Sequence, residues 1–252
     1  MLGEPEVQLV QRISHYLSEQ AKVPASVIDT ISLVFAVCLL DSWAGSSLLS
    51  DVTENWVQEV NQTFERLRRP DGGYAKTSEG HASSTYQTFL IMLAYQLLEL
   101  PLPEPQRAGE FILGQQRDDG GFVEIGVMRR SGTNPTAAAV GALRVLQAQA
   151  SQELLSSSDK ERVASFLTRV QSAEGGYCAN TQIPLADLLS TYTALQTLRD
   201  IDCWEHVDRI AVLEFVKTLQ DPAGGFRAAA WDDTVDVEYS FYGLATLGLL
   251  LA

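Results

Sequence analysis

The sequence predicts an all-α protein of about five helical hairpins that stack on one another and curl into a ring. Two kinds of helical pattern alternate along the chain: amphipathic ones with one charged face, and ones that are apolar nearly all round. Between them a Gly-Gly-aromatic turn recurs four times, at spacings of 48, 55 and 49 residues: Gly72-Gly73-Tyr74, Gly120-Gly121-Phe122, Gly175-Gly176-Tyr177 and Gly224-Gly225-Phe226. The sequence shows no convincing strand period, so helices alone are expected.

The hairpins can be assigned in chain order. The first joins an amphipathic helix around residues 6–21 to the apolar segment 27–40. In the next four, an amphipathic helix ends at the Gly pair, a loop of about ten to fifteen residues follows, and an apolar helix begins at Ser84, Asn134, Ser190 or Glu238. Glycine accepts a positive φ, which lets the chain turn sharply where a helix ends. The apolar helices are expected on the inner side and the amphipathic ones on the outer side.

One domain spanning residues 1–252 is expected, because no linker-like segment breaks the repeat. A composition of 46% hydrophobic and 20% charged residues is that of a globular protein with ample core. The formal charge of −14 argues against nucleic acid or an anionic membrane as partner. The three cysteines are widely spaced and form no CxxC pair, so a cytoplasmic location is expected. No signal peptide is indicated, and the apolar run 27–40 is too short to span a bilayer.

Three copies of the repeat, FILGQQRDDGGF, FLTRVQSAEGGY and FVKTLQDPAGGF, share an aromatic residue, an aliphatic one, glutamine and the Gly pair. With the Tyr-containing apolar helix that follows, this repeat resembles the α/α toroids of protein prenyltransferase β subunits and squalene-hopene cyclase-type triterpene cyclases. The resemblance covers Phe64 to Ala252 and implies an α/α toroid, here an incomplete or five-hairpin barrel. GHASSTYQTFLIMLAY is similar to the start of an inner helix in β subunits, and DVEYSFYGLATLGLL to their zinc segment.

The resemblance implies roles for two residues of the last apolar helix. Asp236 matches the family's zinc aspartate, and Tyr239 matches the tyrosine that helps to bind the diphosphate. Glu238 stands where the family has its zinc cysteine, which replaces a soft thiolate by a hard carboxylate. The family's zinc histidine comes from a further repeat that these residues do not include, and its basic diphosphate-binding residues are absent. Thiol transfer through zinc is therefore poorly supported.

The acidic cluster formed by Asp232, Asp233, Asp236 and Glu238 has three interpretations. The carboxylates could simply cap the helix that starts there. Alternatively, Asp236 and Glu238 bind a divalent metal, Zn or the harder Mg²⁺, and through it an isoprenoid diphosphate. Finally, the run from Trp231 to Thr234 is similar to the Asp-x-Asp-Asp-Thr protonation motif of class II terpene cyclases, with Ala230 in place of the first aspartate.

The remaining candidates would complete an isoprenoid site. His81 is a polar group at the pocket mouth or a hydrogen-bonded structural residue, and Arg129 and Arg130 are anion ligands or a solvated turn. Arg68 and Arg69 are expected to serve at the surface. The aromatic residues near the starts of the apolar helices would line the cavity, or simply pack in the core: Tyr86, Tyr192, Tyr239 and Phe241. The catalytic candidates are Asp236, Tyr239, His81 and Asp233, and the substrate-binding candidates are Arg129, Arg130, Tyr86, Tyr192, Phe241 and Trp231.

The leading hypothesis is a prenyltransferase-like protein that binds an isoprenoid diphosphate in a central apolar cavity and transfers the prenyl group. A second hypothesis is a non-catalytic repeat scaffold for a protein partner, with the acidic cluster serving as caps. A class II terpene-cyclase-like enzyme is the third. These hypotheses imply an isoprenoid small molecule or a protein subunit as partner.

Overall fold

A computed structural model describes residues 6–22, 26–45, 48, 54–150 and 153–251. Residues 1–5, where a leader would begin, lie outside this set.

The contacts divide the chain into two compact units, residues 1–108 and 109–252, and each unit is described by itself. The first contains α1 (Val7–Gln20), α2 (Val27–Ala44), α4 (Glu54–Leu67), β1 (Tyr74–Ala75), β2 (Ser83–Ser84) and α5 (Thr85–Leu97). Helix α6 (Pro105–Gly114) crosses the boundary. The second contains α7 (Thr133–Ala150), α8 (Ser157–Val170), β3 (Tyr177–Cys178), β4 (Ala186–Asp187), α9 (Leu188–Asp200), η1 (Trp204–His206), α10 (Arg209–Leu219), β5 (Phe226–Arg227), β6 (Val235–Asp236) and α11 (Val237–Leu251).

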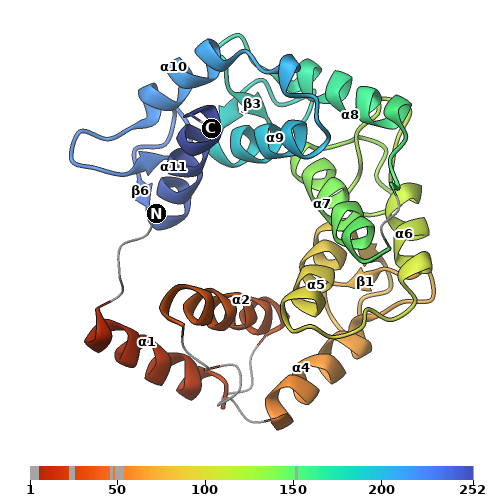
Figure 1. Cartoon of the computed structure of the whole chain (residues 1–252). Coiled ribbons are helices and arrows are strands. Elements are labelled where there is room, and N and C mark those ends of the chain that lie inside the picture. The colour runs from red at the N-terminus through yellow and green to blue at the C-terminus, as the bar shows by residue number, and fades with distance from the viewer. Residues whose placement is uncertain (1–5, 23–25, 46–47, 49–53, 151–152, 252) are drawn as a thin grey trace. The chain divides into compact units, whose positions relative to one another are not determined.

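The helices are arranged in pairs, as the sequence predicts. In the second unit α7, α9 and α11 lie one beside the next, while α8 packs against α7 and α10 against α11 on the other side (Figure 1). In the first unit α2 packs against α1, α4 and α5. The apolar helix α9 lies between two like helices, which buries its aliphatic residues Leu188, Leu195 and Leu198. This burial is why that sequence can be apolar nearly all round.

The same hydrogen bond connects each Gly-Gly turn to the helix that follows it. The backbone N–H of the aromatic residue donates to a hydroxyl fourteen residues later: Tyr74 to Thr88 (2.9 Å), Phe122 to Thr136 (2.9 Å), Tyr177 to Thr191 (3.0 Å) and Phe226 to Ser240 (3.1 Å). We call this bond the hydroxyl latch. It satisfies a backbone donor that burial of the aromatic residue removes from water. It also fixes the start of the inner helix relative to the turn.

The turn glycines allow neighbouring hairpins to approach until their backbones touch. Gly120 has φ of +89°, and a Cβ added there would lie 2.2 Å from the carbonyl oxygen of Arg162 in α8. Gly175 has φ of +96°, and its added Cβ would lie 2.2 Å from the carbonyl oxygen of Ala211 in α10. Only glycine meets both requirements, the positive φ and the missing side chain.

Three short antiparallel ladders are the main departure from the predicted all-helical pattern. Each closes the loop after a Gly pair, with β1 paired to β2, β3 to β4 and β5 to β6. In the second of them, Tyr177 faces Asp187 and Cys178 faces Ala186. Two-residue strands leave no alternating pattern in a sequence, which is why they were not predicted. The ladders place the turn beside the first residue of the inner helix.

Helix α2 is longer than the sequence suggested, because it continues to Ala44. At 18 residues its length and composition would allow it to cross a membrane, and one such helix is found among the described residues. In the first unit its residues Ile31, Val34, Val37 and Leu40 are buried. Burial covers 22% of this span.

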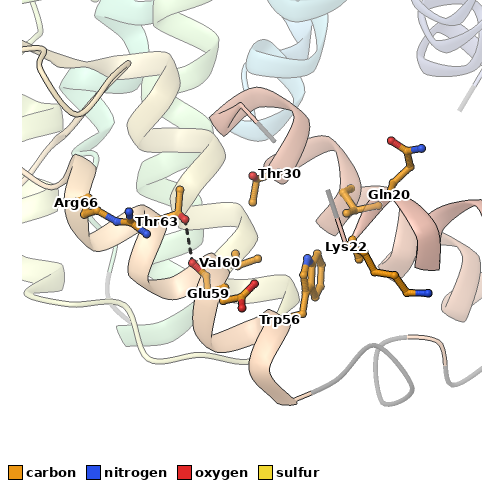
Figure 2. Close-up of a pocket in the computed structure, with 10 residues that line it drawn as sticks. Gln20, Lys22, Thr30, Trp56, Glu59, Val60, Thr63 and Arg66 are labelled. Carbon is orange, nitrogen blue, oxygen red and sulfur yellow. Dashed lines mark hydrogen bonds between the residues drawn. The ribbon is translucent and has the colours of Figure 1, made fainter. Parts of the chain in front are cut away.

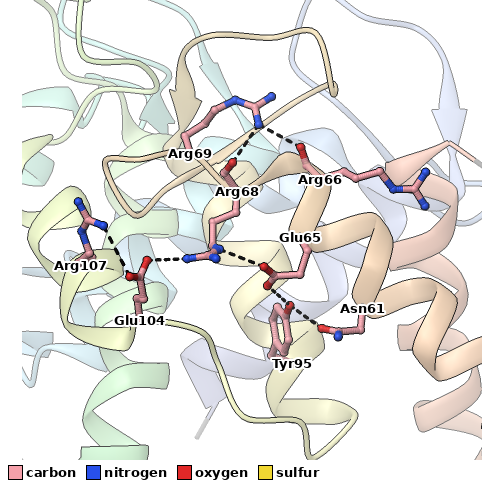
Figure 3. Close-up of polar contacts among 8 residues, drawn as sticks. All are labelled: Asn61, Glu65, Arg66, Arg68, Arg69, Tyr95, Glu104 and Arg107. Atoms are coloured by element: carbon pink, nitrogen blue, oxygen red, sulfur yellow. Dashed lines mark hydrogen bonds and ion pairs between the residues drawn. The ribbon is translucent and has the colours of Figure 1, made fainter.

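Arg68 and Arg69 lie partly exposed at the surface, as expected, and both make structural contacts there. Arg68 pairs with both Glu65 and Glu104, and the Tyr95 hydroxyl lies 3.2 Å from the same Glu65 (Figure 3). Arg69 donates to the backbone carbonyls of Gly80 (2.7 Å), Thr77 (3.0 Å) and Ser78 (2.9 Å). Arg69 therefore holds the loop after the first turn in place, and Arg68 joins α4 to Glu104, just before α6.

Candidate functional site

The acidic residues at the start of α11 make local contacts. Asp236 precedes the first residue of the helix, and its Oδ1 accepts the backbone N–H of Tyr239 at 2.8 Å. This is an N-cap, so the capping interpretation is confirmed for Asp236. Glu238 accepts the hydroxyl of Tyr242 at 3.2 Å, and Asp232 accepts the backbone N–H of Thr234 at 2.9 Å. Both Asp236 and Glu238 keep exposed side chains.

Asp187 belongs to the same acidic region, although the sequence analysis did not select it. It caps α9 as Asp236 caps α11, and it accepts both the backbone N–H (2.7 Å) and the hydroxyl (2.9 Å) of Ser190. Burial raises the pKa of Asp187. Burial also raises the pKa of Tyr239, and the negative charges of Asp187 and Glu238 raise it further. Aligning ADLLSTYT with VDVEYSFY, 49 residues later, would have identified Asp187.

Three of the predicted wall aromatics come together with a fourth that was not predicted. The ring centroid of Tyr192 on α9 lies 5.7 Å from that of Phe241 and 5.6 Å from that of Tyr242, both on α11. Tyr242 also lies 5.9 Å from Tyr239. These four residues are called the aromatic cluster below. Such distances are typical of offset and edge-to-face ring pairs. Phe241 remains more than half exposed, so part of this apolar surface faces solvent.

The proposed metal ligands remain a prediction. Among the described residues, no three His, Cys, Asp or Glu side chains lie close enough together to hold a metal ion. Asp236 and Glu238 are two residues apart at the helix start, and substrate oxygens or water would have to complete any coordination shell. Asp233 is fully exposed, 3.9 Å from Arg227, and Trp231 is also exposed. Proton donation of the cyclase kind depends on a carboxylic acid kept out of water, and Asp233 is in water.

Arg129 and Arg130 lie on an exposed loop that another arginine fixes. The guanidinium of Arg117 donates to the backbone carbonyl of Gly126 at 2.9 Å and to that of Met128 at 3.2 Å. Arg69 makes the same kind of contact in the first unit, where His81 and Tyr86 are exposed on either side of β2. Two candidates therefore belong to the first unit and the others to the second.

The contacts of Arg117 with the loop carbonyls are called the loop clamp. The loop that carries Arg129 should become more mobile when this clamp is removed. In Arg117→Met we expect faster amide hydrogen exchange in residues 124–130, by about tenfold, because the donors to the loop carbonyls are lost. Arg144→Met is the matched control, since Arg144 pairs with Asp200 on α9 and not with the loop. Exchange followed by mass spectrometry measures both variants. Equal protection in Arg117→Met and the unchanged protein would contradict the clamp.

The first unit contains a cavity of about 360 Å³. It lies between α4 on one side and α1 and α2 on the other (Figure 2). Its lining includes Lys22, Thr30, Trp56, Glu59, Thr63 and Arg66. None of the predicted site residues lines it.

Repeated helical hairpins joined by Gly-Gly turns define an α/α-toroid protein of the prenyltransferase kind. The sequence profile of the prenyltransferase alpha-alpha toroid domain matches residues 14–156 and 136–252. The chain therefore belongs to this family, and the predicted fold class is confirmed.

One protein similar in sequence and one similar in structure are prenyltransferases, in agreement with this family. The chain is 29% identical over 102 residues to the β subunit of protein farnesyltransferase from Saccharomyces cerevisiae, a match that covers 38% of this chain and 23% of the relative. The matched region thus spans about a quarter of that relative's length. Protein geranylgeranyltransferase-I of Candida albicans, complexed with GGPP, is similar in structure with a TM-score of 0.72 at 15% identity, covering 98% of this chain and 79% of that one.

A second kind of enzyme shares the fold. A variant of the type II terpene cyclase MstE from Scytonema, in complex with geranylgeranyl dihydroxybenzoate, is similar with a TM-score of 0.60 at 15% identity. That match covers 98% of this chain and 82% of the cyclase. Structural similarity at 15% sequence identity shows that this chain and the cyclase share a fold.

Proposed function

We propose that the chain binds an isoprenoid diphosphate along the aromatic cluster and transfers its prenyl group. The observation that carries this proposal is the meeting of Tyr192, Tyr239, Phe241 and Tyr242 at the first turns of α9 and α11. An apolar ring surface that is partly in water gains free energy when a hydrocarbon covers it. Tyrosine and phenylalanine faces also attract the positive charge that develops when a diphosphate leaves.

Charged groups at the start of α11 and on the loop before α7 suit the diphosphate. Arg129 and Arg130 supply guanidinium groups, which bind phosphate oxygens by paired hydrogen bonds. Asp236 and Glu238 supply carboxylate oxygens, which suit Mg²⁺ better than the soft thiolate sites of zinc. In the transfer, an acceptor nucleophile forms a bond to the first carbon of the prenyl chain. The carbon–oxygen bond breaks, and the diphosphate leaves with the electron pair.

The binding step is tested with geranylgeranyl diphosphate. Tyr192→Ala should weaken its affinity about tenfold, because the ring touches two other members of the cluster and its loss opens the wall. Isothermal titration with and without Mg²⁺ or Zn²⁺ measures the affinity. Tyr16→Ala is the control, since Tyr16 is an exposed tyrosine of α1 in the first unit. Undetectable binding by the unchanged protein would refute the proposal.

The metal and transfer steps need separate variants. Asp236→Asn keeps a capping side chain but removes the charge, whereas Asp236→Ala removes both. If the residue binds a metal, both variants lose metal-dependent binding and transfer of a radiolabelled prenyl group. If it only caps α11, Asp236→Asn should behave like the unchanged protein. If Asp236→Ala and Glu238→Ala leave binding and prenyl transfer unchanged in every assay, the proposal that the chain is an enzyme loses its support.

A further inference from the structure

The cavity of about 360 Å³ in the first unit has an apolar floor. Leu33 of α2 and Trp56 and Val60 of α4 line it, and these residues are 9%, 6% and 2% exposed. Every residue of the lining lies between Gln20 and Arg66, within the first unit (Figure 2). Small-molecule sites in proteins have volumes of this order, with mostly apolar walls and a few polar groups that fix the ligand's orientation.

The wall formed by α4 is a single stripe of that helix. Its members recur every three or four residues, which is the spacing of one helix face: Trp56, Glu59, Val60, Thr63 and Arg66. Glu59 and Arg66 are two helical turns apart, so their Cα atoms are separated by about 10 Å along the helix axis. The stripe therefore presents a carboxylate and a guanidinium group, with the apolar side chain of Val60 between them.

Both of these charged groups are available to a ligand. Within the described part of the chain, the Thr63 hydroxyl donates to the backbone carbonyl of Glu59 at 2.9 Å, and the Glu59 carboxylate makes no ion pair. Arg66 donates from Nε to the backbone carbonyl of Gln62 at 3.2 Å, which leaves its two Nη groups free among these residues. The remaining cation of the lining, Lys22, already pairs with a glutamate of α1 at 2.6 Å.

We propose that this cavity binds a small zwitterion, namely a short peptide with free ends and an apolar side chain. Its ammonium group pairs with Glu59, its carboxylate with Arg66, and its side chain packs on Trp56. An extended peptide spans at most about 3.6 Å per residue, so two or three residues match the separation of the two charges. A zwitterion has no net charge for the chain's formal charge of −14 to repel, whereas an anion would be repelled. The inference is independent of the proposed isoprenoid function.

The probe is the tripeptide Ala-Leu-Ala with free ends, titrated calorimetrically into the full chain, where we expect one saturable site. Acetylation of the amino end, or amidation of the carboxyl end, should each weaken binding at least about tenfold, because each removes one charged hydrogen-bonding group. Glu59→Gln should abolish the preference for the free amino end, and Arg66→Gln the preference for the free carboxylate. Glu99→Gln and Arg12→Gln are the matched controls, since both residues are exposed in the first unit and neither lines the cavity.

Tryptophan fluorescence locates the bound peptide, because Trp56 is one of four tryptophans. The peptide should change the emission of the unchanged protein and of Trp204→Phe, but not that of Trp56→Phe. An equal change in both variants would place the peptide elsewhere and overturn the proposal. Undetectable binding would also overturn it, as would equal affinity for the acetylated peptide, which would indicate a simple anion site. A urea transition like that of the unchanged protein shows that each variant folds.

Discussion

Gly175→Ala should destabilise the second unit by about 2–5 kcal/mol. Part of the loss, about 1–2 kcal/mol, is the cost of holding a residue with a Cβ at positive φ. The rest is overpacking, about 1–3 kcal/mol, since the new methyl group would lie 2.2 Å from the carbonyl oxygen of Ala211. The obstacle is the backbone of α10, which cannot move aside as a flexible side chain can. The hairpins on either side would have to separate.

Gly224→Ala separates the two causes of that loss. Gly224 also has a positive φ, but a methyl group added there would meet none of the described residues. We therefore expect a loss of about 1–2 kcal/mol from the backbone alone. Urea unfolding followed by circular dichroism measures both variants, with the transition of the second unit compared between them. Equal losses would mean that the approach of α10 to Gly175 is not close.

Thr191→Val should cost the second unit about 1–3 kcal/mol. The substitution keeps the shape of the side chain but removes its hydroxyl, which accepts the N–H of Tyr177 at 3.0 Å. The hydroxyl latch of this repeat is then lost. Thr191 and Tyr177 are both 0% exposed, so water cannot replace the lost acceptor. A buried N–H without a partner costs its desolvation free energy.

The matched control is Thr191→Ser, because serine already makes the latch in the fourth repeat, where Ser240 accepts the N–H of Phe226. This variant should retain most of the stability, losing only the contacts of one methyl group. The same urea titration measures it beside Thr191→Val. A serine variant as unstable as the valine variant would show that packing at the methyl group, and not the hydrogen bond, stabilises the turn.

Helical repeats were predictable because they leave a strong periodic signal over many residues. The Gly pairs and apolar helices identified the hairpins and their order, and the family profile agrees. The ladders and the loop clamps were not predictable. A two-residue strand has no period, and the role of Arg69 or Arg117 depends on which carbonyls the loop turns toward it.

The candidate site was predicted in part for the same reasons. Tyr192, Tyr239 and Phe241 start inner helices, and packing of α9 on α11 brings them together. Tyr242 was missed because its contact with Tyr192 depends on helix rotation. Asp187 was not predicted, because a lone aspartate before a helix is ordinarily a cap, and the sequence of that repeat does not show that the fold buries it. For the metal, the sequence predicts two ligands, Asp236 and Glu238, and among the described residues no third His, Cys, Asp or Glu lies with them.

The hydroxyl latch has a consequence for how the protein folds. Each latch joins residues only fourteen positions apart, so every hairpin can form its own turn before distant parts of the chain have met. Contacts of short sequence separation favour rapid folding, and repeat arrays can nucleate at any repeat and grow by adding neighbours. Within the second unit the hairpin of α8 and α9, which has α7 on one side and α11 on the other, should then open last when the native protein fluctuates.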